Sequence, residues 1–263
     1  MCYDADASPP IHGPAVTTVS GAPLLLTSAD ATPFAAYLAA PARPTGIGVL
    51  LLPDNGGLSR FYERLAVRLA EQGHTALAVD YYGRTAGARY HERPADFAAL
   101  PNLMPHLTRL RPDTLYADFD AGIAHLRADG GGRARAVVSL GFCIGGRFAF
   151  LTSAERFGLA GAIGLYGALD TINGAPGPIQ RAGELRAPIL GLFGGADPHI
   201  PAGTVAAFDA ALSEGGVPHE IVTYPGAPHG FFEQELREQA DASADASADA
   251  WRRILAFLQR AGG

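Results

Sequence analysis

Three side chains with complementary chemistry, Cys143, Asp197 and His229, each stand just after a short apolar run. A cysteine thiolate is a strong nucleophile, an imidazole transfers protons near neutral pH, and a carboxylate can hold that imidazole in one orientation. Together they could attack an electrophilic carbon, give a proton to the leaving group and then activate water. This chemistry requires structural elements that bring the three side chains within hydrogen-bonding reach of one another.

Cys143 stands between glycines, in Gly141-Phe142-Cys143-Ile144-Gly145, after an apolar run and before a helical pattern. This is the nucleophile-elbow pattern G-x-S-x-G with cysteine in place of serine. The nucleophile's backbone is strained in such a turn, so neighbours two residues away must lack bulk. The adjoining helix N-terminus can stabilise a thiolate or an oxyanion. Taken alone, the stretch also fits a glycine-rich turn around a small packed cysteine, but it lacks the G-x-G-x-x-G spacing of a dinucleotide site.

Asp197 and His229 follow two later apolar runs, in the chain order that a nucleophile, an acid and a histidine take in α/β-hydrolases. The run 189–194 leads into the loop that contains Asp197, and the run 220–224 leads into the loop that contains His229. Because parallel strands end at the same edge of a sheet, both side chains are expected to converge with Cys143.

Simpler interpretations of these residues remain open. Asp197 could cap a helix that starts near Pro201, and His229 could be an ordinary loop histidine. His199 competes for the role of base, although its position two residues after Asp197 favours a loop residue.

Apolar runs alternate with helical patterns along most of the chain. Two early runs, 23–27 and 33–40, predict a leading pair of strands. This alternation predicts an α/β protein with the α/β-hydrolase fold, a doubly wound, mostly parallel sheet flanked by helices in a single domain. The runs that predict buried parallel strands are 46–52, 75–80, 136–141, 161–166, 189–194 and 220–224.

Three stretches show the spacing of amphipathic helices. The first, 59–73, stops at Gly73; the second, 113–126, has Asp113 as its predicted cap; the third lies around 250–259. The repeat DASADASADA before the third predicts an exposed helix or a linker into it.

Residues 1–20 are interpreted as an N-terminal tail and 21–263 as the α/β-hydrolase domain. The segment 81–112 is long for a connection within a compact domain and is predicted to be a lid or binding segment. A short helix is expected over Ala95–Leu103. The side chains expected to contribute to a pocket there, or to the core, are Tyr82, Tyr90, Phe97 and Leu103.

Composition excludes several classes of function. The net charge of −6 argues against a nucleic-acid partner, and all 20 basic residues are arginine, which excludes lysine Schiff-base chemistry and a Walker A loop. The two cysteines, Cys2 and Cys143, are too few for a zinc cluster and are not expected to form a disulfide. The chain shows neither a signal-peptide pattern nor a membrane-spanning run, so a cytoplasmic protein without membrane partners is expected.

The motifs C-x-G-G, G-G-x-D-x-x-x-P and H-G-F together make the chain resemble the dienelactone hydrolase family over roughly residues 45–260. The resemblance implies a catalytic triad of Cys143, Asp197 and His229 that acts on an ester or lactone. It also implies an oxyanion hole formed by the backbone N–H groups of Ile144 and Asn55.

Further positions can be matched to the family, and two of them depart from its pattern. Asp54 stands where the family has a thiol-activating Glu and is one methylene shorter, so it is either that activator or a turn-capping residue. Arg84 matches an Arg that binds the substrate carboxylate, and Tyr82 is a second candidate for substrate binding. Glu233 replaces the family's second Arg, which argues against dienelactone itself as the substrate.

The expected activity is hydrolysis of a carboxylic ester or lactone through a thioester on Cys143, with water activated by His229 and Asp197. The partner is a small-molecule substrate, no metal or organic cofactor is expected, and the protein is a monomer or small homo-oligomer. Two alternatives stay open: a non-catalytic or redox-sensing domain with a reactive Cys143, and the same triad acting on a phosphotriester or on an acyl acceptor other than water.

Overall fold

The computed structural model describes residues 7–11, 13–232 and 241–262, with side chains in the last helix described from residue 245. The chain forms two compact units, one of Met1–Ser8 with His12–Val137 and the other of Pro9–Ile11 with Val138–Gly263. No helix in the part of the chain that the structure describes is long and apolar enough to cross a membrane.

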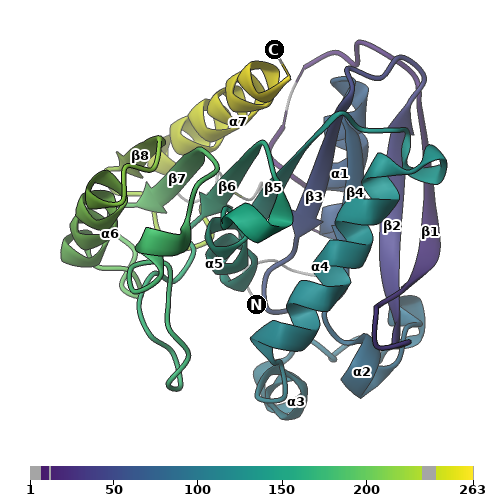
Figure 1. Cartoon of the computed structure of the whole chain (residues 1–263), viewed down its shortest axis with the longest axis horizontal. Helices are drawn as coiled ribbons and strands as arrows, with labels where there is room; N and C mark the ends of the chain where they lie inside the picture. Colours follow the sequence, from purple (N-terminus) through teal and green to yellow (C-terminus); the bar gives the residue numbers. More distant parts are fainter. Residues whose placement is uncertain (1–6, 12, 233–240, 263) are drawn as a thin grey trace. The chain divides into compact units, whose positions relative to one another are not determined.

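The first unit contains four strands in the order β1-β2-β4-β3. The β1–β2 and β2–β4 pairs are antiparallel, whereas β3 and β4 are parallel. Helices α1 and α4 lie on opposite faces of these strands (Figure 1). The elements are β1 Val19–Thr27, β2 Pro33–Pro41, β3 Ile47–Leu52, α1 Arg60–Glu71, β4 Thr75–Val79, α2 Gly83–Ala86, α3 Leu100–Leu107 and α4 Pro112–Arg127.

The second unit contains four parallel strands in the order β5-β6-β7-β8. All residues of β6 and β7 are buried, as their continuous apolar runs predict. The elements are β5 Ala136–Phe142, α5 Ile144–Leu151, β6 Gly161–Leu165, β7 Ile189–Gly194, α6 Ala202–Glu214, β8 His219–Tyr224 and α7 Asp241–Ala261.

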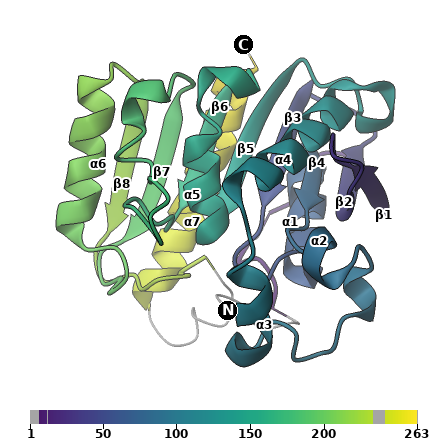
Figure 2. The same ribbon diagram turned by 60° about the horizontal axis from the view of Figure 1, so that its bottom comes forward.

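Two glycines of β6 allow helices to approach both faces of this sheet. A Cβ on Gly161 would lie 2.5 Å from the Phe257 ring of α7, and one on Gly164 would lie 2.4 Å from the Phe150 ring of α5. Residues three apart in a strand point to opposite faces, so α5 and α7 cover opposite faces of β6, as Figure 2 shows. The position of α5 matters most, because it begins directly after Cys143.

The predicted strands and amphipathic helices are all present, but two local predictions are wrong. Asp113 does not cap α4: the helix begins with Pro112, its N-cap residue is Arg111, and Asp113 lies in the first turn. Proline is favoured at the first helical position because it has no N–H to satisfy. The short helix expected over Ala95–Leu103 is displaced to Leu100–Leu107.

Residues near both ends of the described part of the chain have defined structure. Arg64 donates to the carbonyl oxygen of Ala7 (3.1 Å) and to the hydroxyl of Ser8 (2.7 Å), and Ala7 is buried. Within the repeat DASADASADA, α7 begins at Asp241, so the repeat is helical from there rather than a linker. Cys2 lies outside the described residues.

Candidate active site

Cys143 occupies the turn between β5 and α5 with an unusual backbone conformation. Its φ is 55° and its ψ is −117°, a region that residues with a side chain rarely adopt. Its N–H donates to the carbonyl oxygen of Leu165 (3.1 Å), and its own carbonyl accepts the first hydrogen bond of α5, from the N–H of Arg147 (3.1 Å). This is the geometry expected of a nucleophile elbow.

The glycines around the elbow are required by close backbone contacts. A Cβ on Gly141 would lie 1.9 Å from the carbonyl oxygen of Gly145, so the turn could not close with any larger residue. A Cβ on Gly146 would lie 2.6 Å from the carbonyl oxygen of Leu165, at the end of β6. The first of these glycines makes the sharp turn possible, and the second lets α5 pack directly on the neighbouring strand.

His229 and Asp197 form a close pair in the loops that follow β8 and β7. His229 Nδ1 lies 2.6 Å from Asp197 Oδ2, and Asp197 Oδ1 accepts the backbone N–H of His199 (2.8 Å). The Asp197 side chain is 1% exposed and that of His229 is 21% exposed. The carboxylate is therefore fixed on both oxygens, and it fixes the imidazole in turn.

Electrostatics tie His229 to Cys143 as well as to Asp197. Burial by itself lowers the pKa of His229, but hydrogen bonds to Asp197 and to Cys143, together with the thiolate charge of Cys143, outweigh burial and raise this pKa to about 9. Burial raises the pKa of the Asp197 carboxyl, but the hydrogen bonds from His229 and from the His199 N–H outweigh it and hold this pKa below its ordinary value. At neutral pH these shifts favour the imidazolium form of His229 beside the Asp197 carboxylate.

The simpler interpretations of these residues do not match the geometry. Helix α6 begins after Pro201 without a side-chain cap, so Asp197 does not serve as one. His199 contributes its backbone N–H to Asp197, and its ring packs edge-on against His229 at 5.4 Å between centroids. The imidazole that contacts Asp197 through a ring nitrogen is that of His229.

Of the other predicted site residues, Asp54 and Asn55 belong to the first unit. Asp54 is 3% exposed, and its Oδ1 accepts the N–H of Gly56 (2.8 Å), which is the contact of a turn-capping aspartate. Its role as an activator of the thiol stays a prediction, as does the role of the Asn55 N–H in an oxyanion hole. The Asn55 carbonyl accepts a hydrogen bond from the Tyr82 hydroxyl.

Arg84 is held by acidic side chains within the first unit. Its guanidinium forms ion pairs with Asp118 and with Asp30, the latter at 2.9 Å, and it donates to Ser28 Oγ (3.2 Å). A substrate carboxylate would have to compete with these partners, so carboxylate binding by Arg84 stays a prediction. Glu233 lies outside the described residues.

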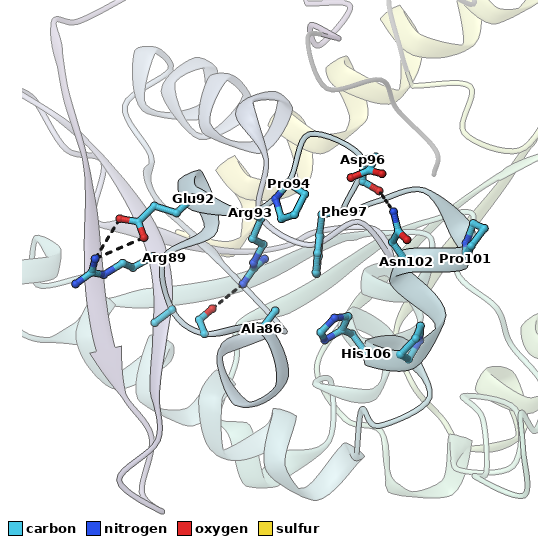
Figure 3. Close-up of a pocket in the computed structure, with 13 residues that line it drawn as sticks. Ala86, Arg89, Glu92, Arg93, Pro94, Asp96, Phe97, Pro101, Asn102 and His106 are labelled. Carbon is cyan, nitrogen blue, oxygen red and sulfur yellow. Dashed lines mark hydrogen bonds and ion pairs between the residues drawn. The ribbon is translucent and has the colours of Figure 1, made fainter.

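Residues within the segment 81–112 line a cavity of about 920 Å³ (Figure 3), and a role of this segment in binding stays a prediction. Its lining lies between Ala86 and His106 and includes Phe97, whose ring packs edge-on against that of Tyr82 and at a tilt against that of His106. Leu103 is fully buried and belongs to the core. Every lining residue lies in the first unit, and none belongs to the group of Cys143, Asp197 and His229.

Two residues near the elbow were not expected from the sequence. Tyr166, directly after β6, has a φ of 38°, and its ring lies 5.0 Å from that of His229. Arg147 in α5 is 5% exposed, and its side chain binds backbone carbonyls of the loop after Tyr166. Tyr166 ends an apolar run and Arg147 lies in a helical pattern. The sequence around each of them therefore does not indicate that it lies near the site.

Known proteins share both the sequence pattern and the architecture. The model of the dienelactone hydrolase family matches residues 34–262. A Salmonella typhimurium protein named "Putative carboxymethylenebutenolidase" is 33% identical over 259 residues, which cover 96% of this chain and 92% of that protein. A Bradyrhizobium protein named "Probable 2-oxo-3-(5-oxofuran-2-ylidene)propanoate lactonase" is 28% identical over 85% of this chain and 88% of that protein.

Solved structures support the same family and fold. The crystal structure of a "Putative Dienelactone Hydrolase" from Klebsiella pneumoniae matches with a TM-score of 0.78 at 28% identity, over 92% of this chain and 99% of that one. A puromycin hydrolase structure matches with a TM-score of 0.69 at 21% identity over 92% of this chain and 39% of that one, which shows the fold. The predicted α/β-hydrolase fold is confirmed, and the chain belongs to the dienelactone hydrolase family, as a hydrolase of the ester and lactone type.

Proposed function

We propose that the protein hydrolyses a carboxylic ester or lactone with Cys143 as the nucleophile, His229 as the proton carrier and Asp197 as the residue that orients His229. The observation that carries this proposal is the environment of one imidazole: His229 Nδ1 lies 2.6 Å from Asp197 Oδ2, and both Asp197 and Cys143 raise the pKa of His229. A redox-sensing cysteine needs a reactive thiol but no oriented imidazole–carboxylate pair, so this geometry favours catalysis.

In the first half of the reaction, the Cys143 thiolate attacks the carbonyl carbon and a C–S bond forms. The backbone N–H of Ile144, at the start of α5, is the proposed donor to the oxyanion; one such donor typically lowers the barrier by about 3–4 kcal/mol. The tetrahedral intermediate collapses, the C–O bond to the alcohol breaks, and the leaving alkoxide takes the proton of the His229 imidazolium. The enzyme is left as a thioester with a neutral imidazole.

Formation of the thioester lowers the pKa of His229, and hydrolysis of the thioester then uses the neutral imidazole as the base. Two of the causes that raise its pKa, the hydrogen bond to the Cys143 thiolate and its charge, vanish when the sulfur is acylated. Burial continues to lower this pKa and the hydrogen bond to Asp197 continues to raise it, so the loss of the Cys143 contributions lowers the pKa of His229. The imidazole, which has given its proton to the leaving alkoxide, can then accept a proton from water. The hydroxyl adds to the thioester, the C–S bond breaks, and the thiolate–imidazolium pair is restored.

The test is turnover of an activated aryl ester by Cys143→Ala and His229→Ala, each compared with Cys2→Ser, which removes the other cysteine of the chain. We expect Cys143→Ala and His229→Ala to lose activity and retain their far-ultraviolet circular dichroism, while Cys2→Ser behaves as the wild type. Wild-type turnover by Cys143→Ala would refute the proposal. Stoichiometric alkylation of Cys143 without turnover of any substrate would favour the redox alternative.

The substrate class can be narrowed by charge. Glu233 stands where the family's second substrate-binding Arg is expected, so we propose neutral esters or lactones rather than dienelactone. A panel should pair each neutral lactone with a carboxylate-bearing analogue, including an oxofuranylidene lactone of the kind that the Bradyrhizobium relative's name specifies. A phosphotriester in the same panel tests the alternative electrophile. Preferential turnover of the carboxylate-bearing lactones would contradict this proposal.

A further inference from the structure

The guanidinium of Arg147 lies at the centre of the loop that follows β6. Arg147 is four residues after Cys143 and is 5% exposed. Its Nη1 donates to the carbonyl oxygens of Ala168 (3.3 Å) and Asp170, and its Nη2 donates to those of Ala175 and Pro176 (both 3.0 Å). The two sides of the 168–176 loop are therefore joined through one side chain of the elbow helix.

The backbone of Arg147 is also in direct contact with this loop. A Cβ on Gly167 would lie 2.5 Å from the backbone N of Arg147, so the loop starts against the first turn of α5. The loop is braced within itself, since Ile179 N–H donates to Leu169 O (3.1 Å) and Gln180 Nε2 donates to Asp170 Oδ1 (2.6 Å). Removing the guanidinium would leave four carbonyl oxygens without their shared donor, each of which carries a desolvation cost.

Tyr166 connects this loop to His229. Its φ of 38° is strained for a residue with a side chain and persists only if the surrounding structure imposes it. The N–H of Tyr166 donates to Leu192 O in β7 (2.8 Å), and its ring lies against His229 at 5.0 Å between centroids and against Phe231 at 5.4 Å. The tyrosine ring thus limits how far the imidazole can tilt between its partners.

We propose that Arg147 is a positioning residue of the active site: by fastening the 168–176 loop to the elbow helix, it keeps the Tyr166 ring against His229. It thereby sets the orientation of the imidazole relative to Asp197 and Cys143. This inference rests on the proposed function. Lysine cannot replace arginine fully here, because its single ammonium group cannot span carbonyls on both sides of the loop as the planar fork does.

The test compares Arg147→Met and Arg147→Lys in a Cys2→Ser background, where Cys143 is the only thiol. We expect Arg147→Met to lower kcat about tenfold to hundredfold with little change in KM, because a misplaced catalytic group costs about that much. The pH midpoint of Cys143 alkylation by iodoacetamide should rise, since the imidazolium no longer stabilises the thiolate in the same place. Arg147→Lys should recover part of both losses.

Two further variants provide a matched control, Arg186→Met, and an independent test of the same contact, Tyr166→Leu. Arg186 also donates to loop carbonyls, those of Gly183 (2.9 Å) and Leu185 (2.6 Å), but it is exposed, so Arg186→Met should change neither readout. Tyr166→Leu leaves the guanidinium in place and should show the same lower kcat and higher alkylation midpoint as Arg147→Met. It provides the test if Arg147→Met does not fold.

The double variant decides whether Arg147 acts through Tyr166. If it does, Arg147→Met with Tyr166→Leu should be no worse than either single variant, because the same contact is lost in each. Additive losses, or an unchanged kcat and alkylation midpoint in folded Arg147→Met, would overturn the inference. Failure of the proposed function would be seen separately, as wild-type turnover by Cys143→Ala.

Discussion

The Asp197→Asn substitution tests the arrangement of the three residues with almost no change in side-chain volume. Asp197 Oδ1 accepts the N–H of His199 at 2.8 Å, so the amide oxygen of an asparagine would take this place. The amide NH₂ would then face His229 Nδ1, which lies 2.6 Å from the present Oδ2. An NH₂ group can only donate, so Nδ1 must lose its proton and the hydrogen must move to Nε2. The imidazole would be held in the wrong tautomer.

The size of the effect follows from this change of tautomer. In serine hydrolases with the same arrangement, the equivalent substitution lowers kcat about 10⁴-fold. At about 1.4 kcal/mol for each tenfold change in rate, a loss of 10³ to 10⁴ corresponds to about 4–5.5 kcal/mol of transition-state stabilisation. We expect a loss in this range for kcat with an activated aryl ester, with a smaller change in KM, because the interaction is needed in the transition state more than in substrate binding.

The pH profile provides a second measurement on the same variant. The raised pKa of His229, about 9, means that its imidazolium persists below that pH and is lost above it. Acylation needs this proton for the leaving group, so wild-type activity should fall as the pH rises through about 9. Asp197 is one of the causes that raise the pKa of His229, so in Asp197→Asn the fall should begin at lower pH.

An Asp–His pair elsewhere in the second unit provides the control. Asp209 Oδ1 lies 3.2 Å from His219 Nε2, and the Asp209 side chain is 54% exposed. Exposed pairs contribute little to stability, so Asp209→Asn should leave both kcat and the pH profile unchanged. If Asp197→Asn retains the wild-type kcat and an unshifted profile, the proposed orientation of His229 is refuted.

Three further substitutions test the framework of the site and of the first unit. Gly141→Ala should prevent the elbow from closing, because the added Cβ would lie 1.9 Å from Gly145 O; near-native thermal unfolding would contradict this. Arg93→Met should lower the free energy of unfolding by about 3–5 kcal/mol in urea titrations, because it leaves the fully buried Asp80 carboxylate without its ion pair at 2.6 Å. A loss below about 1 kcal/mol, which is the scale of an exposed pair, would show that this ion pair is dispensable. Cys143→Gly should be more stable than Cys143→Ala, because glycine relieves a strained φ that costs about 1–3 kcal/mol; equal or reversed melting temperatures would argue against strain at this position.

Features governed by local pattern were predictable from the sequence. The buried strands are continuous apolar runs, and the amphipathic helices repeat at helical spacing, as with Phe61, Leu65 and Leu69 on the buried face of α1. The pairing of His229 with Asp197 could be predicted because each follows a strand of a parallel sheet, and such strands end at one edge.

Features that depend on tertiary contacts were not predictable. The start of α3 is an exception, because Pro101 near its start is a local signal in the sequence that favours a helix beginning there rather than at residue 95. The contact of Ala7 with Arg64 joins residues 57 positions apart and leaves no local pattern. The role of Arg147 depends on four carbonyl oxygens in a loop more than 20 residues away, whereas an arginine in a helix ordinarily indicates a solvent-facing position.

The backbone conformation of Cys143 supports the proposal that this cysteine is reactive rather than merely packed. A cysteine buried only for its volume could occupy the first turn of an ordinary helix, at negative φ and without cost. Here Cys143 has a φ of 55° and Tyr166 has a φ of 38°, and both side chains are directed to His229 through a hydrogen bond and a ring contact. Strain at two positions that interact with the same imidazole reduces stability. The strain is therefore best explained by the orientation it imposes on His229, with the glycines at 141, 146 and 167 permitting the close backbone contacts that sustain it.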